Sequence, residues 1–282
     1  MKRATENQDM KARCIRCTRH LAALLGCLAI GLSPNALAGD FSINPIRIFL
    51  SKDRKADVVT VRNNGTVPLQ FEIRPREWTQ APSGEDVYVD TRDLLVFPRL
   101  MVLKGGEDRD IRIGMRIPPG ATEKTYRVYI NELPPTVNPE DADGPSANAN
   151  VGFLINFALP VFFAPLEPAP ALQVTHFDLS GGRIDVKLAN TGNTHLFVEE
   201  MVLIGSDASG AEVYRKAIPE RYVLAGTTRS YEENIPTQDC AALAAVVFSV
   251  RTDKTIADAK KEIDNHSCGS AIPGTPAPDS AR

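Results

Sequence analysis

Histidine side chains are the groups in this chain best suited to acid–base or metal chemistry, because their ordinary pKa lies near neutrality. Beyond residue 38 they are His176, His195 and His266, which are far apart in the sequence. Glu199 is the one acidic neighbour of His195 at a plausible spacing, and a metal site needs more ligands than such a pair supplies. The segment 205–210 does not fit the G-x-S-x-G pattern of a serine nucleophile and is more typical of a hairpin turn. With no phosphate loop or dinucleotide fingerprint either, we expect no enzyme, no metal and no cofactor.

The expected role of the cysteines depends on which of them remain in the mature protein. Cys14, Cys17 and Cys27 belong to an N-terminal segment that we expect to be removed, so the CxxC spacing of the first two indicates no redox or metal role. Cys240 and Cys268 remain as an even pair. In an oxidising compartment such a pair is typical of a disulfide, and two separate buried thiols are the alternative.

The first 38 residues have the order of a secretory signal peptide: basic residues, an apolar run over 21–32, then the small-residue site Ala36–Ala38. The run has about 12 residues, too few for a membrane span. A lipoprotein signal ending at Cys27 is the alternative, but it leaves only 21–26 as its apolar part, so we favour cleavage after Ala38 and a periplasmic location. Cleavage removes six of the 32 basic and two of the 35 acidic residues. The remaining formal charge of −7 argues against a nucleic-acid binder.

The elements that position any functional residue are predicted to be almost all β-strands. Residues 69–73 and 126–130 alternate between polar and apolar side chains, as half-buried strands do, and proline and glycine interrupt the chain at short intervals. Residues 61–69 and 188–196 share a strand, an Asn-x-Gly turn and a second strand. The sequence therefore predicts two similar sandwiches in tandem, with a boundary near the proline-rich segment 164–170.

One strand is unusually apolar on one face. Five alternate residues are large and apolar, and in a strand they share one side: Val151, Phe153, Ile155, Phe157 and Leu159. Such a row is typical of a core strand. It is equally suited to an edge strand that lends its apolar side chains to a partner, with main-chain hydrogen bonds to hold that partner.

These features together resemble the periplasmic chaperones of the chaperone–usher pilus pathway. The segments that carry the resemblance are 41–47 (FSINPIR), 61–65 (VRNNG), Trp78, 94–99 (LLVFPR), 110–113 (DIRI), 126–135 (YRVYINELPP) and 190–193 (NTGN), with the cysteine pair. The resemblance implies an all-β fold of two immunoglobulin-like β-sandwich domains in a boomerang arrangement. We expect the chain to divide into a signal peptide (1–38), an N-terminal domain with its donor strand (39–165), a C-terminal domain (166–268) and a disordered tail (269–282).

In this family the last strand of the first domain enters a pilin subunit that lacks its own final strand. The resemblance therefore implies that the apolar row from Val151 to Leu159 is the pilin donor strand. It also implies that an arginine on the first strand, here Arg47, anchors the C-terminal carboxylate of the pilin. A guanidinium suits this role because it holds a carboxylate with two parallel hydrogen bonds.

The chain departs from the better-known members at two positions. Pro160 replaces a lysine that serves as the second carboxylate anchor, and Ala164 replaces an arginine of the interdomain ion network. Another cation must then complete the anchor, and we expect Arg99 to do so, ahead of Lys104 and Arg112. The L-P-V-F form of this segment and the second-domain cysteine pair look more like the archaic (σ-type) branch.

The sequence therefore predicts a periplasmic chaperone that binds pilin subunits, completes their fold and delivers them to an outer-membrane usher. A dimer that covers the free edge is a further expected state. The first rival is a secreted pilin or adhesin subunit, which usually carries an N-terminal donor extension; here residues 39–41 lead directly into a strand. The second rival, a secreted hydrolase, lacks a nucleophile and base at suitable spacing.

Overall fold

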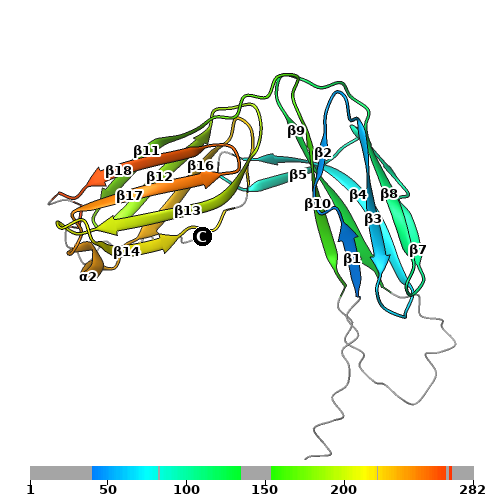
Figure 1. Cartoon of the computed structure of the whole chain (residues 1–282), viewed down its shortest axis with the longest axis horizontal. Coiled ribbons are helices and arrows are strands. Elements are labelled where there is room, and N and C mark those ends of the chain that lie inside the picture. Colours follow the sequence, from blue (N-terminus) through cyan, green and yellow to red (C-terminus); the bar gives the residue numbers. More distant parts are fainter. Residues whose placement is uncertain (1–39, 82, 135–153, 221, 265–266, 269–282) are drawn as a thin grey trace, which may run out of the picture. The chain divides into compact units, whose positions relative to one another are not determined.

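The computed structural model has two β-sandwiches, and most of their strands are labelled in Figure 1. It describes residues 40–81, 83–134, 154–220, 222–264 and 267–268. The expected signal peptide, the donor residues Val151 and Phe153 and the C-terminal tail lie outside the described residues. Within them the expected all-β fold is confirmed, and none of their helices is long and apolar enough to cross a membrane.

The first sandwich has two sheets, one in the order β1-β3-β8-β6 and the other in the order β2-β10-β9-β4-β5, with β7 also paired to β4. Its strands are β1 (Phe41–Asn44), β2 (Ile48–Leu50), β3 (Ala56–Asn63), β4 (Leu69–Gln80), β5 (Asp86–Asp90), β6 (Leu94–Phe97), β7 (Leu100–Leu103), β8 (Asp108–Met115), β9 (Lys124–Leu133) and β10 (Asn156–Phe163).

The core of this sandwich follows from alternate burial along its strands. In β9 the side chains of Tyr126, Val128 and Ile130 are fully buried, and β10 adds Leu159 and Val161 on the same face. Each large apolar side chain removed from water contributes about 1.5 to 3 kcal/mol to folding. The C-terminal half of β10 is therefore a core strand of its own sandwich.

The second sandwich has one sheet in the order β11-β12-β16 and another in the order β14-β13-β17-β18, with β15 paired to β13. Its elements are β11 (Leu172–Ser180), β12 (Arg183–Asn190), β13 (Leu196–Ser206), β14 (Glu212–Ala217), β15 (Tyr222–Val223), β16 (Thr228–Asn234), the short helix α2 (Thr237–Cys240), β17 (Ala245–Thr252) and β18 (Ile256–Glu262).

The repeated Asn-x-Gly motif has the same structural role in both sandwiches. Asn63 is fully buried; its side-chain amide donates to two backbone carbonyls at 2.8 and 3.1 Å and accepts from the Gly65 N–H at 3.0 Å. Asn190 is 1% exposed, donates to two carbonyls at 2.8 and 2.9 Å, and accepts from the Gly192 N–H at 3.0 Å. Each asparagine thus satisfies buried backbone groups around its turn, which confirms that the two segments are structural counterparts.

The two remaining cysteines form the expected disulfide. Cys240 is the last residue of α2, and its sulfur bonds to that of Cys268 across a Cα–Cα distance of 5.6 Å, which suits a disulfide. The bond ties the segment after β18 to the helix.

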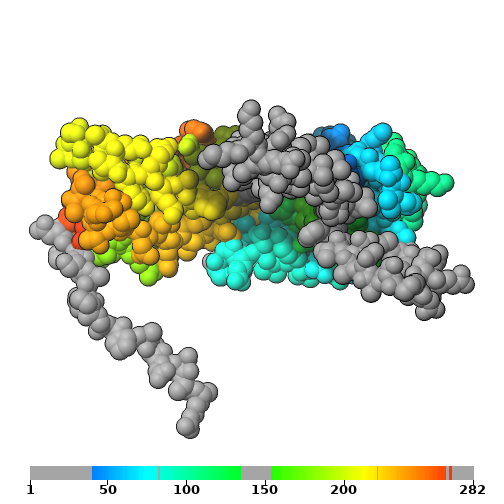
Figure 2. Space-filling view, turned by 90° about the horizontal axis from the view of Figure 1, so that it is seen from below, coloured from blue at the N-terminus to red at the C-terminus, as the bar shows by residue number. Residues whose placement is uncertain are grey.

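β5 is an edge strand, and in Figure 2 it appears in turquoise at the surface of the first sandwich. Val87 and Val89 are 39% and 57% exposed on it, between the charged residues Asp86 and Asp90. Charges at both ends of an apolar edge strand discourage pairing with another chain.

Candidate functional site

An aromatic cluster forms where the first sandwich packs against the second. Trp78 of β4 and Phe162 of β10 are each 1% exposed and pack against Tyr222 of β15 and the adjacent Leu224. The rings of Trp78 and Tyr222 meet edge to face at a centroid distance of 5.4 Å, a favoured aromatic geometry. The cluster gives the neighbouring charged side chains a low-dielectric platform.

Arg127 of β9 lies on this platform. Its guanidinium carbon is 3.9 Å from the Trp78 ring centroid and 5.6 Å from that of Tyr222, which is a cation–π arrangement. Its Nη1 donates to the backbone oxygen of Ala158 at 3.2 Å, so the guanidinium extends over β10. Arg127 Nε and Trp78 Nε1 are both buried without a hydrogen-bond partner among the described residues.

Arg47 approaches the same cluster from the other side of β10. It lies in a bend between β1 and β2 rather than on the first strand, and its guanidinium carbon is 4.5 Å from the ring centroid of Phe197. Arg47 directly precedes Ile48, which pairs with Val161 of β10, whereas Arg127 pairs with Pro160. The two arginine backbones therefore flank β10 at nearly the same level, about 10 Å apart.

The structure does not bring Arg99 to this place. Arg99 is exposed and lies between β6 and β7, and its carbonyl accepts from the Ile73 N–H at 2.8 Å. In the sheet order, β7 and β2 have β10, β9 and β4 between them, so Arg99 and Arg47 are about 19 Å apart across the sheet. The cation that lies beside Arg47 across β10 in the structure is Arg127. In the sequence, Arg127 stands out only as the arginine of the YRxxxxELPP segment. That motif does not indicate which residue of β10 lies opposite Arg127.

The polar and charged side chains near the platform are mostly paired with one another. Burial, together with the carboxylate of Asp86, raises the pKa of Tyr88 to about 12, so this hydroxyl remains a neutral donor. It donates to Asp86 at 3.1 Å. Neighbouring arginines are already paired, Arg74 with Glu72 at 2.7 Å and Arg76 with an oxygen of Asp90 at 3.3 Å. Arg127 has no such ion pair among the described residues.

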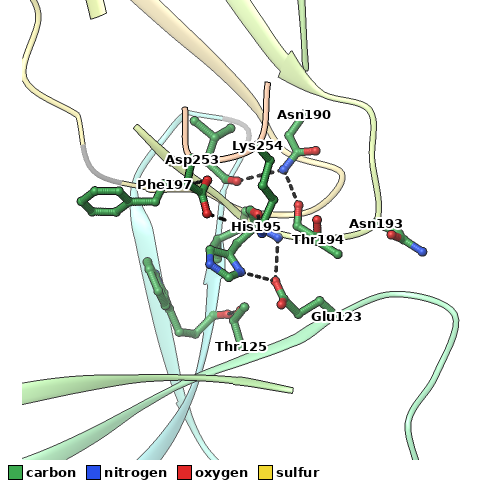
Figure 3. A network of polar contacts seen from close by, with 12 residues as sticks. Glu123, Thr125, Asn190, Asn193, Thr194, His195, Phe197, Asp253 and Lys254 are labelled. Atoms are coloured by element: carbon green, nitrogen blue, oxygen red, sulfur yellow. Dashed lines mark hydrogen bonds and ion pairs between the residues drawn. The ribbon is translucent and has the colours of Figure 1, made fainter. Parts of the chain in front are cut away.

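A buried hydrogen-bonded pair, Glu123 and His195, lies next to the cluster (Figure 3). One carboxylate oxygen of Glu123 accepts from the backbone N–H of His195 at 2.6 Å and from its ring Nδ1 at 2.7 Å. The two side chains are only 4% and 5% exposed, and the imidazole stacks on Phe162 at a centroid distance of 3.6 Å. His195 therefore pairs with Glu123 and not with Glu199, whose carboxylate is 3.6 Å from Arg251.

Hydrogen bonds of two amide side chains hold the same region. Gln80 donates to the Tyr222 carbonyl at 3.0 Å and accepts from the Leu224 N–H at 2.9 Å, so its amide acts as one more backbone unit beside β15. Asn193 donates to the carbonyls of Ala121 and Glu167, both at 2.9 Å. Because these bonds join the two sandwiches and the connector, the platform is built on firmly held elements.

The expected donor row changes character along β10. Ile155 is 38% exposed and lies just before the strand, Phe157 is half-buried, and Leu159 is fully buried in the core of the first sandwich. All of β10 pairs with β9, but only residues 161–163 of β10 pair with β2. Within the described residues, the edge from Asn156 to Pro160 therefore has no strand partner. Pro160 suits such an edge because it has no N–H to donate.

Comparison with known proteins finds one matching protein family. Residues 40–168 match the family model for the pili and flagellar-assembly chaperone, PapD N-terminal domain. A search of curated proteins finds no match.

Several solved structures share the fold. A chain of the CsuC–CsuE chaperone–tip adhesion subunit pre-assembly complex, from the archaic chaperone–usher Csu pili of Acinetobacter baumannii, is 18% identical with a TM-score of 0.54, over 77% of this chain and 98% of that one. The class 5 fimbriae chaperone CfaA is 18% identical with a TM-score of 0.51, over 79% and 99%. The YadV chaperone is 14% identical with a TM-score of 0.51, over 79% and 100%.

Proposed function

We propose that the chain is a pilus-assembly chaperone, without enzymatic activity, that completes the core of a pilin subunit with its own donor segment; the match of residues 40–168 to the PapD N-terminal domain supports this proposal. We further propose that it works in the periplasm and passes the subunit to an outer-membrane usher. The solved complex of the Csu chaperone with a tip adhesion subunit is an example of this kind of partnership.

The observation that carries the proposal is the open edge of β10. Its main-chain groups from Asn156 to Pro160 face no strand of the described chain, and Ile155 projects beyond the first sandwich's core. A pilin strand that pairs here gains ladder hydrogen bonds, and its pockets receive the alternate side chains of the row. Leu159 serves as the fixed end of that row, since it is buried in the chaperone.

We propose that Arg47 and Arg127 together bind the C-terminal carboxylate of the pilin. They flank Pro160, the position at which the family has its second anchor, and both rest on the aromatic cluster. The guanidinium of Arg127 is already oriented by the Trp78 ring on which it rests. A carboxylate held here fixes where the last pilin strand begins along β10.

Co-expression tests the proposed function directly. Each secreted β-protein encoded beside the chaperone gene is produced with the tagged chaperone in a bacterial periplasm, and bound subunits are identified by mass spectrometry. We expect one or more pilin subunits to co-purify as one-to-one complexes and to aggregate without the chaperone. Subunits that remain soluble and unbound would contradict the proposal.

Loss of Arg127 is expected to weaken pilin binding about 10- to 100-fold. Each charge-assisted hydrogen bond to a carboxylate contributes about 1.5 to 3 kcal/mol, and about 1.4 kcal/mol corresponds to a factor of ten. The measurement is the pilin affinity of Arg127→Ala and Arg47→Ala, compared with Arg99→Ala as the control of equal charge change. Arg99→Ala is expected to bind as the wild type does.

A pilin with one extra C-terminal residue distinguishes the carboxylate from other acceptors. Moving the carboxylate should weaken binding to the wild-type chaperone but hardly change binding to Arg127→Ala, because that variant has already lost the anchor. Equal weakening of both proteins, or an effect of Arg99→Ala as large as that of Arg127→Ala, would show that the anchor lies elsewhere.

The archaic branch remains a prediction that rests on the L-P-V-F segment and the cysteine pair. Structural likeness at 18% identity extends to the archaic Csu complex and to the class 5 chaperone alike. The fold is therefore shared across branches.

A further inference from the structure

The pairing of β10 with β9 ends in an irregular way at Glu132. The strand register runs from Phe163 opposite Lys124 to Asn156 opposite Asn131. One step further, the Glu132 N–H still donates to the Ile155 carbonyl at 3.1 Å. In a regular antiparallel pair the Ile155 N–H would return a bond to the Glu132 carbonyl. It donates instead to the side-chain oxygen Oε2 of Glu132, at 3.1 Å.

Glu132 occupies a position where an apolar residue would be ordinary. It continues the buried row of Val128 and Ile130 on the core face of β9, and it is only 8% exposed. A carboxylate taken out of water costs free energy unless it is hydrogen-bonded. In the described part of the chain, the donor that reaches this carboxylate is the Ile155 N–H. The carboxylate therefore binds a single backbone group, the Ile155 N–H, next to the start of β10.

Burial decreases along β10 toward this same point, from the fully buried Leu159 through the half-buried Phe157 to the exposed Ile155. Leu154 is 45% exposed and Ile155 is 38% exposed, whereas Leu159 on the same face as Ile155 is fully buried. Glu132 therefore lies where the buried part of β10 gives way to exposed residues.

We propose that Glu132 is a positioning residue that sets the register of the donor segment. It binds the Ile155 amide, so that the residues before Ile155 leave the chaperone's sheet at one fixed point and enter the pilin in one alignment. This inference rests on the proposed function and adds to it a residue that controls which donor side chain meets which pilin pocket.

Register matters because strand pairing repeats. A slip of one residue turns every donor side chain to the wrong face. A slip of two residues keeps the face but moves each side chain about 7 Å along the groove. Core packing from Leu159 onward already fixes β10 against β9, and the Ile155–Glu132 bond extends this fixed alignment to the last residue pair before the segment that we propose to enter the pilin.

The test uses the full-length mature chaperone and the pilin subunit that co-purifies with it. In the free protein, Glu132→Ala is expected to increase amide hydrogen exchange at Ile155 at least tenfold, with the exchange of β9 unchanged. Pilin affinity is expected to fall about tenfold. Glu132→Gln keeps an acceptor oxygen at the same place and is expected to retain affinity within about threefold of the wild type.

A disulfide introduced by Asn131→Cys and Asn156→Cys separates the effect on register from an effect on general stability. Asn131 and Asn156 are directly opposite each other next to the Glu132–Ile155 pair, on the outer face of the sheet. The bond fixes the register without restoring the carboxylate. We expect Glu132→Ala in the cross-linked protein to bind pilin within about twofold of the cross-linked protein that keeps Glu132.

The following results would contradict the inference about Glu132 or the proposed function. Wild-type affinity of Glu132→Ala despite fast exchange at Ile155 would overturn the inference. So would a folded Glu132→Ala protein that the cross-link does not rescue, or a cross-linked protein with Glu132 intact that fails to bind. If the wild type itself binds no pilin, the proposed function fails instead.

Discussion

Replacing Ile155 with aspartate is expected to abolish pilin recovery while the chaperone stays folded. Ile155 is already 38% exposed in the free protein, so a carboxylate there remains in water. In the complex the same side chain would enter the pilin core. The lost apolar burial of about 1.5 to 3 kcal/mol then adds to the cost of burying an unpaired charge. Phe153→Asp is expected to behave in the same way if the row continues beyond the described residues. Co-purification of pilin with each variant is the measurement.

Leu154→Asp is the matched control for this experiment. Leu154 is the adjacent residue and is 45% exposed, but alternation places it on the opposite face of an extended chain. It should therefore capture pilin nearly as well as the wild type. Equal loss with Leu154→Asp, or normal recovery with both Ile155→Asp and Phe153→Asp, would remove the donor row from the proposal. Leu159→Asp is no substitute, because Leu159 is fully buried and its replacement would unfold the chaperone itself.

Replacing Glu123 with alanine is expected to lower the free energy of unfolding by about 2 to 6 kcal/mol, because two buried donors lose their acceptor at about 1 to 3 kcal/mol each. The variant leaves two donors of His195, its backbone N–H and its Nδ1–H, buried without an acceptor. Glu123→Gln keeps one acceptor oxygen and should lose about 1 to 2 kcal/mol. Urea titration followed by circular dichroism measures both effects.

Glu85→Ala is the surface control for this series, since Glu85 is exposed and its side chain makes none of these contacts. A change within about 0.5 kcal/mol is expected there. His195→Phe keeps an aromatic ring on Phe162 and removes only the Nδ1 donor, so its loss should be smaller than that of Glu123→Ala. A Glu123→Ala protein as stable as the Glu85→Ala control would mean that this pair contributes nothing to folding.

Local sequence pattern was enough to predict the strands and the repeated turns. Alternation of apolar residues over 126–130 describes a half-buried strand in any fold, and the Asn-x-Gly motifs act through bonds within and next to their own turns. The disulfide followed from counting the cysteines that remain after export. These features depend on neighbours in sequence or on arithmetic, not on packing between sandwiches.

The functional contacts could not be predicted in the same way, because they join distant residues. Glu123 and His195 are 72 positions apart and meet only because the two sandwiches pack together. Arg127 could be placed beside Pro160 only from the register of β9 and β10. Arg99 was chosen for its closeness to a motif, and sheet order puts it elsewhere. Alternation also identified the face that Leu159 shares, but not the point along the strand where the core ends.

The aromatic cluster has a practical consequence for optical measurements. Trp78 is the single tryptophan of the chain, and it is 1% exposed, in contact with Arg127 and with the Tyr222 ring. All tryptophan emission of this protein therefore originates at one known place, where a cation and the second sandwich determine its wavelength and yield. Changes around Arg127 and Tyr222 can therefore be followed by the fluorescence of Trp78 without a label. A pilin without tryptophan would add no background to that signal.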